Sequence, residues 1–330
     1  MDQLTTPEAG ENGEAVTKPT ILVATWGDGL FAVAGDRHTQ EIANQSVRGL
    51  APDGRGGALA IVGSHSLRRR APSGEWATIA TSEFELSCCM AVRDDIYVGT
   101  DDAHMLRLSH GSSVLDPIDS FDNIAGRDEW FAGSAIVNGR RLGPPLGIRS
   151  VAANSNGSIL FANVHVGGIP RSTDGGRTWR PTIDINRDVH EVHAHPADPD
   201  IVVAASAMGL CISYDAGATW TIERDGLHAS YCSAVTFSGD DILVSASTDH
   251  FATQGRIYRR PISPDGETVA VEGGMPAWTE GIVDTGCITV SGPSIAVVDR
   301  TGSLYRSDDF GLAWSCRSTR LPTPSGVLIS

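Results

Sequence analysis

One short motif occurs three times in this chain, and its spacing constrains the fold more than any other feature. Each copy reads Ser-x-Asp-x-Gly-x-x-Trp, with its aspartate at Asp174, Asp215 or Asp309. Asp174 and Asp215 are 41 residues apart, and Asp309 follows Asp215 after 94 residues. The longer interval equals about two further repeats, so the motif marks a structural unit that recurs along the chain.

The residue types of the motif suit a tight turn between two strands. An aspartate carboxylate accepts hydrogen bonds from backbone N–H groups two or three residues later, and the glycine takes a positive φ angle that other residues resist. The tryptophan starts the next strand and buries a large ring between layers. We therefore expect Asp174, Asp215 and Asp309 to be structural, as the clasps of hairpin turns.

A second periodic element is a short apolar run that ends in a small or aliphatic residue. Runs of this length that are apolar throughout are typical of strands buried on both faces. Each run is followed by a short loop and a further strand, so the repeat contains four strands, A to D, with the apolar run as strand B. There are seven such runs: residues 21–24, 58–62, 96–99, 159–162, 201–205, 242–245 and 295–298.

These repeats predict an all-β fold, a seven-bladed β-propeller with four-stranded antiparallel blades. Only six segments qualify as strand A, whereas strand B occurs seven times. Residues 325–330 form a strand candidate with no other role, so we expect this C-terminal strand to complete the first blade beside residues 21–24. Such closure of the ring pairs the two ends of the chain and leaves no open sheet edge.

The rest of the sequence bounds the domain and excludes several partners. Residues 1–19 are polar and are expected to form a disordered tail, followed by a single propeller over residues 20–330 with an insertion at about 123–147 between blades 3 and 4. The net charge of −15 disfavours nucleic acid, and no apolar run is long enough to cross a membrane. The six cysteines include no CxxC pair and no signal-peptide core is present, which predicts a cytoplasmic protein.

The turn motif also carries a family resemblance. Residues 169–179 read Ile-Pro-Arg-Ser-Thr-Asp-Gly-Gly-Arg-Thr-Trp and resemble the Asp-box, or BNR, repeat of bacterial sialidases and their relatives. Residues 193–203 are similar to a turn of sortilin-like and photosystem-assembly-factor propellers. The chain resembles BNR-repeat glycosyl hydrolases and WD40/YVTN/BNR-like proteins over about residues 20–330. The resemblance implies glycosyl-hydrolase-like activity and Asp-boxes on the face opposite the active site.

Polar residues gather where the B–C loops and the starts of strand A meet, on the predicted top face. Blades four to six supply four histidines there, together with two aspartates. These groups suit a divalent metal site such as zinc, or a general acid and base, and each histidine could instead only hydrogen-bond a loop. The candidate catalytic residues are His165, His190, His228, Asp249, His250 and Asp284, and the four histidines are also the candidate metal ligands.

Aromatic and basic residues on the same face are candidates for substrate binding. They are Trp26, Arg48, Trp130, Arg149, Tyr231 and Arg300.

Two glycosidase patterns can be compared with these residues. Tyr231 and Glu191 could imitate the tyrosine–glutamate pair of sialidases, with Arg48 and Arg149 as two of the three arginines. The Arg-Ile-Pro motif of sialidases is absent, and seven blades depart from their six, so the sequence disfavours a true sialidase. A glycosidase with two carboxylates is the other pattern, and its candidates are Asp101, Asp249, Asp284 and Asp299.

Three functions remain open at this point. The first is a hydrolase- or lyase-like enzyme with a histidine-rich site, acting on a small molecule or glycan. The second is a non-catalytic module that binds a glycan, peptide or protein partner through aromatic anchors such as Trp130 and Trp278. The third, an assembly factor like the photosystem family, ranks last because neither a basic patch nor a secretion signal is evident.

Overall fold

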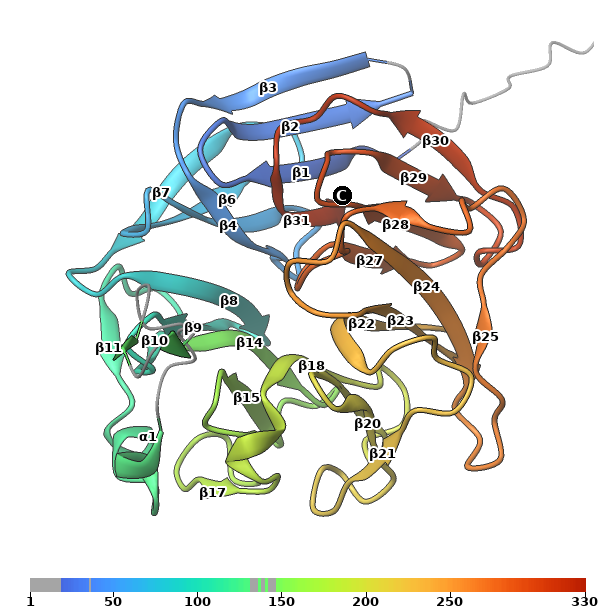
Figure 1. The fold of residues 1–330 in the computed structure, drawn as a ribbon. Helices are drawn as coiled ribbons and strands as arrows, with labels where there is room; N and C mark the ends of the chain where they lie inside the picture. Colours follow the sequence, from blue (N-terminus) through green and yellow to red (C-terminus); the bar gives the residue numbers. More distant parts are fainter. Residues whose placement is uncertain (1–18, 36, 131–135, 138–139, 142–146) are drawn as a thin grey trace, which may run out of the picture.

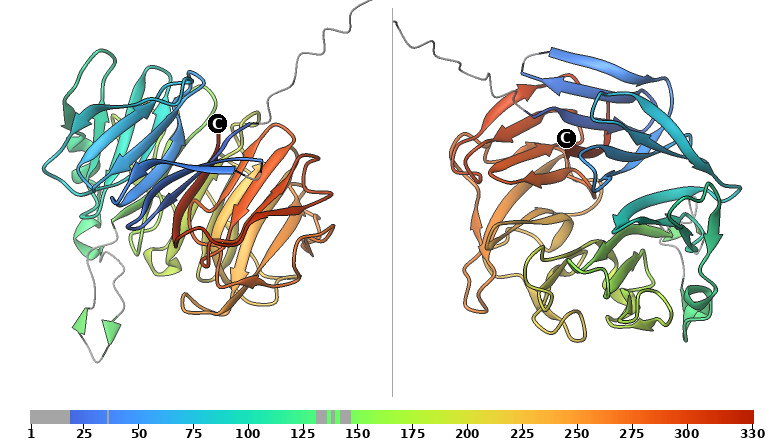
Figure 2. Two further views of the ribbon diagram at one scale, coloured as in Figure 1. Left: turned by 90° about the horizontal axis from the view of Figure 1, so that it is seen from above. Right: turned by 180° about the vertical axis from the view of Figure 1, so that it is seen from behind.

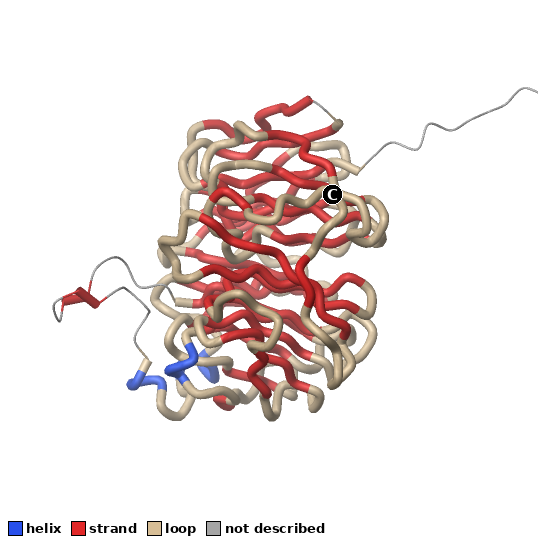
Figure 3. Tube along the Cα trace, turned by 45° about the vertical axis from the view of Figure 1, so that its right-hand side comes forward, coloured by secondary structure: helices blue, strands red, loops and turns tan. Residues whose placement is uncertain are grey.

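The computed structural model describes residues 19–35, 37–130, 136–137, 140–141 and 147–330. Seven antiparallel sheets of four or five strands stand in a ring around a central channel (Figure 1). Figure 2 shows the ring from its edge and from behind, and Figure 3 shows that strands form nearly all of the regular structure. The predicted seven-bladed β-propeller is confirmed.

Each of the first four blades runs from an inner strand at the channel to an outer strand at the rim. Blade 1 consists of β31 (Pro324–Ile329), β1 (Ile21–Thr25), β2 (Gly29–Ala34) and β3 (Arg37–Ala43). Blade 2 consists of β4 (Val47–Pro52), β5 (Ala58–Val62), β6 (Ser66–Arg70) and β7 (Trp76–Thr81). Blade 3 consists of β8 (Leu86–Val92), β9 (Asp95–Thr100), β10 (Met105–Leu108) and β11 (Leu115–Pro117). Blade 4 consists of β14 (Ile148–Ala153), β15 (Leu160–Val164), β16 (Pro170–Ser172) and β17 (Arg180–Pro181).

The last three blades follow the same order. Blade 5 consists of β18 (Val189–Ala194), β19 (Val202–Ser206), β20 (Gly209–Ser213) and β21 (Thr221–Glu223). Blade 6 consists of β22 (Tyr231–Ser238), β23 (Asp241–Ser247), β24 (Gln254–Pro261) and β25 (Val269–Ala270), and β26 (Thr279–Glu280) also pairs with β24. Blade 7 consists of β27 (Ile288–Ser291), β28 (Ser294–Val298), β29 (Leu304–Ser307) and β30 (Ser315–Ser318).

Packing of the blades against one another explains the apolar runs. In β1, β5, β15, β19 and β28, the second strands of their blades, every residue is buried. Each blade is covered by a neighbour on both faces, so an alternating pattern would place polar groups in the core. The outermost strands lie at the rim of the ring, and β3 is accordingly exposed along most of its length.

The two ends of the chain close the ring as the sequence predicts. β31 pairs antiparallel with β1, with Ile21 opposite Ile329 and Val23 opposite Val327. Two backbone hydrogen bonds between Thr20 and Ser330, at 2.8 and 3.1 Å, extend this pairing. β31 also contacts β4 and β27, the inner strands of the neighbouring blades. The final strand therefore belongs to the first blade and joins it to the seventh.

The three motif copies form clasp turns, which we define as residues 172–179, 213–220 and 307–314. In the first, Asp174 Oδ1 accepts the backbone N–H groups of Arg177 at 3.0 Å and Thr178 at 2.8 Å. Ser172 Oγ accepts the N–H of Gly176, whose φ is +88°. The aspartate thus bonds three and four residues ahead, one further than the turn chemistry predicts. The equivalent bonds of Asp215 and Asp309 reach four residues ahead at 2.8 and 2.9 Å.

The insertion between blades 3 and 4 contains the short helices α1 (Asp119–Asp122) and η1 (Arg127–Glu129) and a pair of two-residue strands, β12 (Ile136–Val137) and β13 (Arg140–Arg141). A third short helix, η2 (Ile185–Arg187), precedes β18. In the described ranges no helix has the length and apolar character needed to cross a membrane. The predicted tail lies outside the described residues, except for Pro19, whose carbonyl accepts a hydrogen bond from Arg306.

Candidate functional site

A cavity of about 1040 Å³ occupies the central channel. The inner strands β4, β8, β14, β18, β22 and β31 line it, together with residues 284–287, which lead into β27. All seven blades therefore contribute to its wall. Nine of the twelve candidate catalytic and substrate-binding residues line this cavity: Trp26, Arg48, Arg149, His165, Tyr231, Asp249, His250, Asp284 and Arg300.

A β-bulge interrupts the pairing of the inner strand with the second strand in three consecutive blades, near the start of the inner strand. In β8, β14 and β18 the pairing with the next strand omits the second residue of the inner strand, and a bulge of this kind re-aims a side chain at the rim of a barrel or next to a site. Two of the omitted residues line the cavity, and the third lies fully buried behind its wall. They are Ser87, Arg149 and His190.

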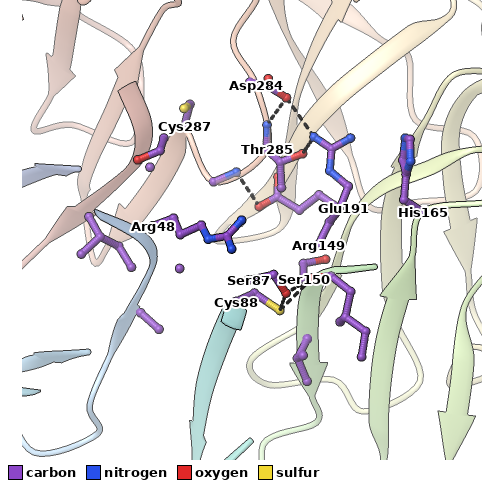
Figure 4. A pocket seen from close by; sticks show the side chains of 18 of the residues that line it. Arg48, Ser87, Cys88, Arg149, Ser150, His165, Glu191, Asp284, Thr285 and Cys287 are labelled. Carbon is purple, nitrogen blue, oxygen red and sulfur yellow. Dashed lines mark hydrogen bonds and ion pairs between the residues drawn. The ribbon is translucent and has the colours of Figure 1, made fainter. Parts of the chain in front are cut away.

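Arg149 reaches across the channel to the segment that leads into β27 (Figure 4). Its Nη2 donates to Thr285 Oγ1 at 2.8 Å and lies 3.2 Å from Asp284 Oδ1, while Arg300 Nη2 lies 3.8 Å from Asp284 Oδ2. Burial raises the pKa of the Asp284 carboxyl, but Arg149, the Thr285 N–H and nearby histidines outweigh burial and hold that pKa below its ordinary value. Asp284 is therefore an ionised carboxylate at neutral pH.

Glu191 places a second carboxylate in the cavity wall, and the backbone of two other blades holds its oxygens. Oε2 accepts the Val235 N–H at 2.9 Å, and Oε1 accepts the Gly286 N–H at 3.1 Å. His193 Nε2 also lies 3.2 Å from Oε1. Glu191 thus ties blade 5 to blades 6 and 7, and it does not use these contacts to activate Tyr231. The ring of Tyr231 lies 4.6 Å from that of His190 instead.

His165 and Asp188 belong to the same wall and form a cluster with His190, which lies buried behind it. Asp188 Oδ1 lies 2.9 Å from His165 Nε2 and 3.6 Å from His190 Nε2. His190 is completely buried, and its Nδ1 lies 2.5 Å from the Cys232 carbonyl oxygen. Burial raises the pKa of Asp188, but the two imidazoles outweigh it and lower that pKa, whereas burial lowers the pKa of His165. The cluster therefore combines an ionised carboxylate with a neutral imidazole.

A buried ion pair joins blades 2 and 3 on the opposite part of the wall. Arg48 donates to both oxygens of Asp101, from Nη1 at 3.2 Å and from Nη2 at 2.8 Å. Burial raises the pKa of the Asp101 carboxyl, and the hydrogen bonds from Arg48 only partly offset this rise. Asp101 and Asp284 are thus two carboxyl groups of one cavity whose pKa values move in opposite directions.

The mouth of the cavity, defined here as Trp26, Asp249, His250, Phe251 and Arg300, carries aromatic rings that face solvent. Trp26 is 53% exposed and Phe251 is 78% exposed. Arg300 Nη1 donates to the His250 carbonyl at 2.7 Å, and Asp249 Oδ1 accepts the Phe251 N–H at 2.7 Å. The loop between β23 and β24 is therefore held in place, while the Phe251 ring, which packs edge to face on His250, remains exposed to solvent.

His228 lies away from the other three histidines. Its Nδ1 is 2.8 Å from the Tyr258 hydroxyl, and its ring meets that of Trp278 edge to face at 4.8 Å. The residue precedes β22 on the outer side of the blade, where it packs on β24, so the predicted quartet of imidazoles is not assembled.

Trp130 is also engaged elsewhere. Its ring lies 5.9 Å from that of Phe121 and 5.0 Å from the Arg127 guanidinium. It therefore covers the apolar cluster under the insertion, and it is not among the described residues that line the channel.

The remaining predicted aspartates stabilise loops. Asp299 is completely buried, and its Oδ1 accepts the N–H groups of Thr301 and Ser303 at 3.1 and 3.0 Å. None of the three clasp aspartates lines the cavity. Their hydrogen bonds stay within their own turns, as a structural role requires.

Asp188 is the site residue that sequence reasoning missed. It follows η2 and adopts a φ of +51°, a backbone conformation that aspartate tolerates better than most residues. The signal in the sequence was weak, because a polar residue ahead of an apolar strand is usual in any turn. Only the packing of blade 5 against blade 4 brings Asp188 to His165.

Comparison with known proteins identifies the fold and nothing narrower. No protein-family model matches the sequence, and no curated protein matches it. Among solved structures, a GH74 enzyme of Niastella koreensis superposes with a TM-score of 0.57 at 14% identity, covering 91% of this chain and 47% of that chain. An ancestral GH74 enzyme gives a TM-score of 0.58 at 14% identity, with coverage of 90% and 40%.

A computationally designed protein, Ika8, is about as similar, with a TM-score of 0.57 at 10% identity and coverage of 94% and 87%. The chain thus spans less than half the length of the two GH74 enzymes. At these identities the likeness establishes a propeller fold, which unrelated functions share.

Proposed function

We propose that the protein is a glycoside-hydrolase-like enzyme whose central cavity binds a glycan or another small polyhydroxylated molecule. The observation that carries this proposal is the pair of cavity carboxyl groups, Asp101 and Asp284, whose pKa values are shifted in opposite directions. Environments that separate two carboxyl groups in this way assign one as the acid and the other as the ionised partner. Glycoside hydrolysis requires such a pair.

The roles follow from the surroundings of each carboxyl group. In this proposal Asp101 donates the proton to the glycosidic oxygen, because burial raises its pKa, and it must first take up a proton and leave its ion pair with Arg48. Asp284 is the base or nucleophile at the anomeric carbon, because Arg149 and Arg300 keep it ionised. The separation of the two groups around a bound substrate then decides whether configuration is retained or inverted.

The mouth of the cavity supplies the binding surface for such a substrate. The exposed rings of Trp26 and Phe251 offer flat apolar faces on which the C–H groups of a sugar ring pack. Arg300 lies between this rim and Asp284, within reach of hydroxyl or carboxylate groups. The clasp turns and the fold shared with GH74 enzymes support kinship with Asp-box glycosyl hydrolases. The proposed activity itself is inferred from the cavity residues.

The proposal is tested by incubating the full chain with a panel of oligosaccharides and measuring newly formed reducing ends. D284N and D101N are each expected to lower the rate by about a hundredfold or more, because each removes a proton-transfer or nucleophilic group. D116N, which changes an exposed aspartate of β11, is the matched control and should retain full activity. Unchanged rates in both D284N and D101N would refute the assigned roles.

A binding module without catalysis is the second candidate, and the free aromatic rings at the mouth favour it. In that case W26A and F251A weaken ligand binding, whereas D284N leaves the ligand unconverted exactly as the unmodified chain does. Calorimetry with a ligand found in the panel separates the two functions. Binding without turnover identifies a module, and turnover that depends on Asp284 identifies an enzyme.

A further inference from the structure

We propose that His165, Asp188 and His190 form a binding site for a divalent transition metal such as Zn²⁺ in the wall of the cavity. The candidate donor atoms, one from each residue, lie within 4.8 Å of one another. The inference goes beyond the proposed glycosidase chemistry, which needs no metal, and it stands on the three side chains alone.

The hydrogen bonding of His190 is the first argument. Its Nδ1 faces the Cys232 carbonyl, an acceptor, so Nδ1 must carry the proton and Nε2 presents a lone pair. Nε2 is buried and has no hydrogen-bond partner among the described residues, although it points at Asp188 Oδ1, another acceptor, 3.6 Å away. A lone pair that faces a carboxylate oxygen is stabilised by a cation between them, which is either a proton on Nε2 or the metal ion that we propose.

Metal-binding histidines show the same arrangement. A ligating imidazole usually donates its second N–H to a backbone carbonyl or a carboxylate, which fixes its tautomer and orientation. The contact between His190 and Cys232 provides this support, and the Tyr231 ring at 4.6 Å restrains the other side of the imidazole. His190 is therefore already oriented as a ligand.

The spacing of the donor atoms is the second argument. Zinc lies about 2.0–2.1 Å from nitrogen and oxygen ligands, so two ligands at a tetrahedral angle are about 3.3 Å apart. Asp188 Oδ1 is 2.9 Å from His165 Nε2 and 3.6 Å from His190 Nε2, on either side of that value. Small side-chain adjustments are enough to bring all three atoms to one ion.

The backbone holds the three residues from separate elements. His165 follows β15, and the bulge in β18 presents His190. Asp188 follows η2, whose N-cap residue Asp184 accepts the Asn186 N–H. The nearby cation Arg149 is neutralised by Asp284, so it offers limited repulsion to a second cation.

Two imidazoles with one carboxylate favour zinc and similar transition metals over magnesium or calcium. Three protein ligands also leave a position for water or a substrate oxygen, and Asp188 and His165 both line the cavity.

The experiment uses the full chain, purified without a histidine tag, stripped with a chelator and titrated with Zn²⁺ alone in a calorimeter. We expect one zinc per chain, and we expect H165Q, D188N and H190Q each to weaken zinc affinity by at least about tenfold. D188N keeps a residue that tolerates the left-handed backbone. Co²⁺ absorption gives a second readout of a low-coordinate nitrogen and oxygen site.

H110Q and H228Q are the matched controls, because His110 is exposed and His228 bonds Tyr258. Both should bind zinc like the unmodified chain. If one cluster variant fails to fold, as judged by circular dichroism, the other two decide the question. A stoichiometry near zero, or equal affinity in the cluster variants and the controls, overturns the site. Zinc binding without oligosaccharide hydrolysis leaves the metal site standing and removes the glycosidase proposal.

Discussion

The clasp turns and the channel wall both rely on carboxylates that accept hydrogen bonds, but the partners come from different distances along the chain. Asp174 bonds residues at most four positions away. Glu191 instead bonds Val235 and Gly286, which are 44 and 95 residues away. The clasps are local turns that each hairpin completes alone, whereas the channel contacts form only when different blades pack together.

The clasp carboxylates and Glu191 also differ in burial. The clasp carboxylates lie at the surface, where water replaces a lost partner, whereas Glu191 is 4% exposed. A buried N–H that loses its acceptor carries the full desolvation cost, and an exposed one does not. We therefore expect the channel to be the more sensitive region, and four measurements test this comparison.

Substitution of Glu191 by alanine is expected to have the largest effect. The N–H groups of Val235, which is buried, and Gly286, which is partly buried, lose their acceptor at about 1–3 kcal/mol each, so the free energy of unfolding falls by about 2–6 kcal/mol. Urea unfolding followed by tryptophan fluorescence measures this loss. E191Q keeps one amide oxygen as an acceptor and should give an intermediate value. A loss no greater than that of D174A would remove the distinction between the regions.

Substitution of Gly217 by alanine tests whether a clasp turn also packs tightly against the neighbouring blade. A Cβ there would lie 2.4 Å from Phe161 Cε1 in blade 4, whereas at Gly176 the nearest atom is 3.5 Å away. Both glycines have a positive φ, so the backbone strain is shared. G217A should therefore be less stable than G176A by about 1–3 kcal/mol in thermal or urea unfolding. Equal losses would show that the contact with Phe161 relaxes freely.

Substitution of Asp174 by alanine should cost less than either change above. The loss of a carboxylate that caps exposed backbone N–H groups typically costs about 1 kcal/mol. D174N retains one oxygen acceptor and should fall between the alanine variant and the unmodified chain in the same urea experiment. If D174A unfolds the protein outright, the clasp has a larger role than local turn closure.

The smallest expected effect is a dependence on pH. Hydrogen bonds from Thr178 lower the pKa of Asp174 to about 2, below its value in an unfolded chain. The stabilisation is therefore complete above the unfolded pKa of about 4 and is lost as the pH falls towards 2. The difference in urea midpoint between the unmodified chain and D174N should shrink over that interval. A difference that is constant between pH 5 and pH 2 would contradict the assigned ionisation.

The site residues could be predicted where their position depends on the local repeat, and not where it depends on contacts between blades. The sequence placed seven of the cavity residues on one face, because the repeat assigns each to a B–C loop or a strand-A start. They are Trp26, Arg48, Arg149, Asp249, His250, Asp284 and Arg300. His228 occupies an equivalent stretch of sequence, yet its side chain turns to Tyr258. The repeat specifies which loop a residue occupies, but packing between blades specifies where its side chain points.

By itself, the sequence determined the blade count, the four-stranded repeat, the clasp turns and the closure of the ring by the final strand. The first three depend on contacts within about one repeat or on an apolar pattern that only burial satisfies, and the closure follows from counting six candidates for strand A against seven for strand B. Tertiary structure alone decided that Asp188 meets His165 and His190, and that Arg149 spans the channel to Asp284. The contacts of Asp188 with His165 and of Arg149 with Asp284 join residues of different blades, and their geometry arises from bulges and from packing between blades that no local pattern encodes.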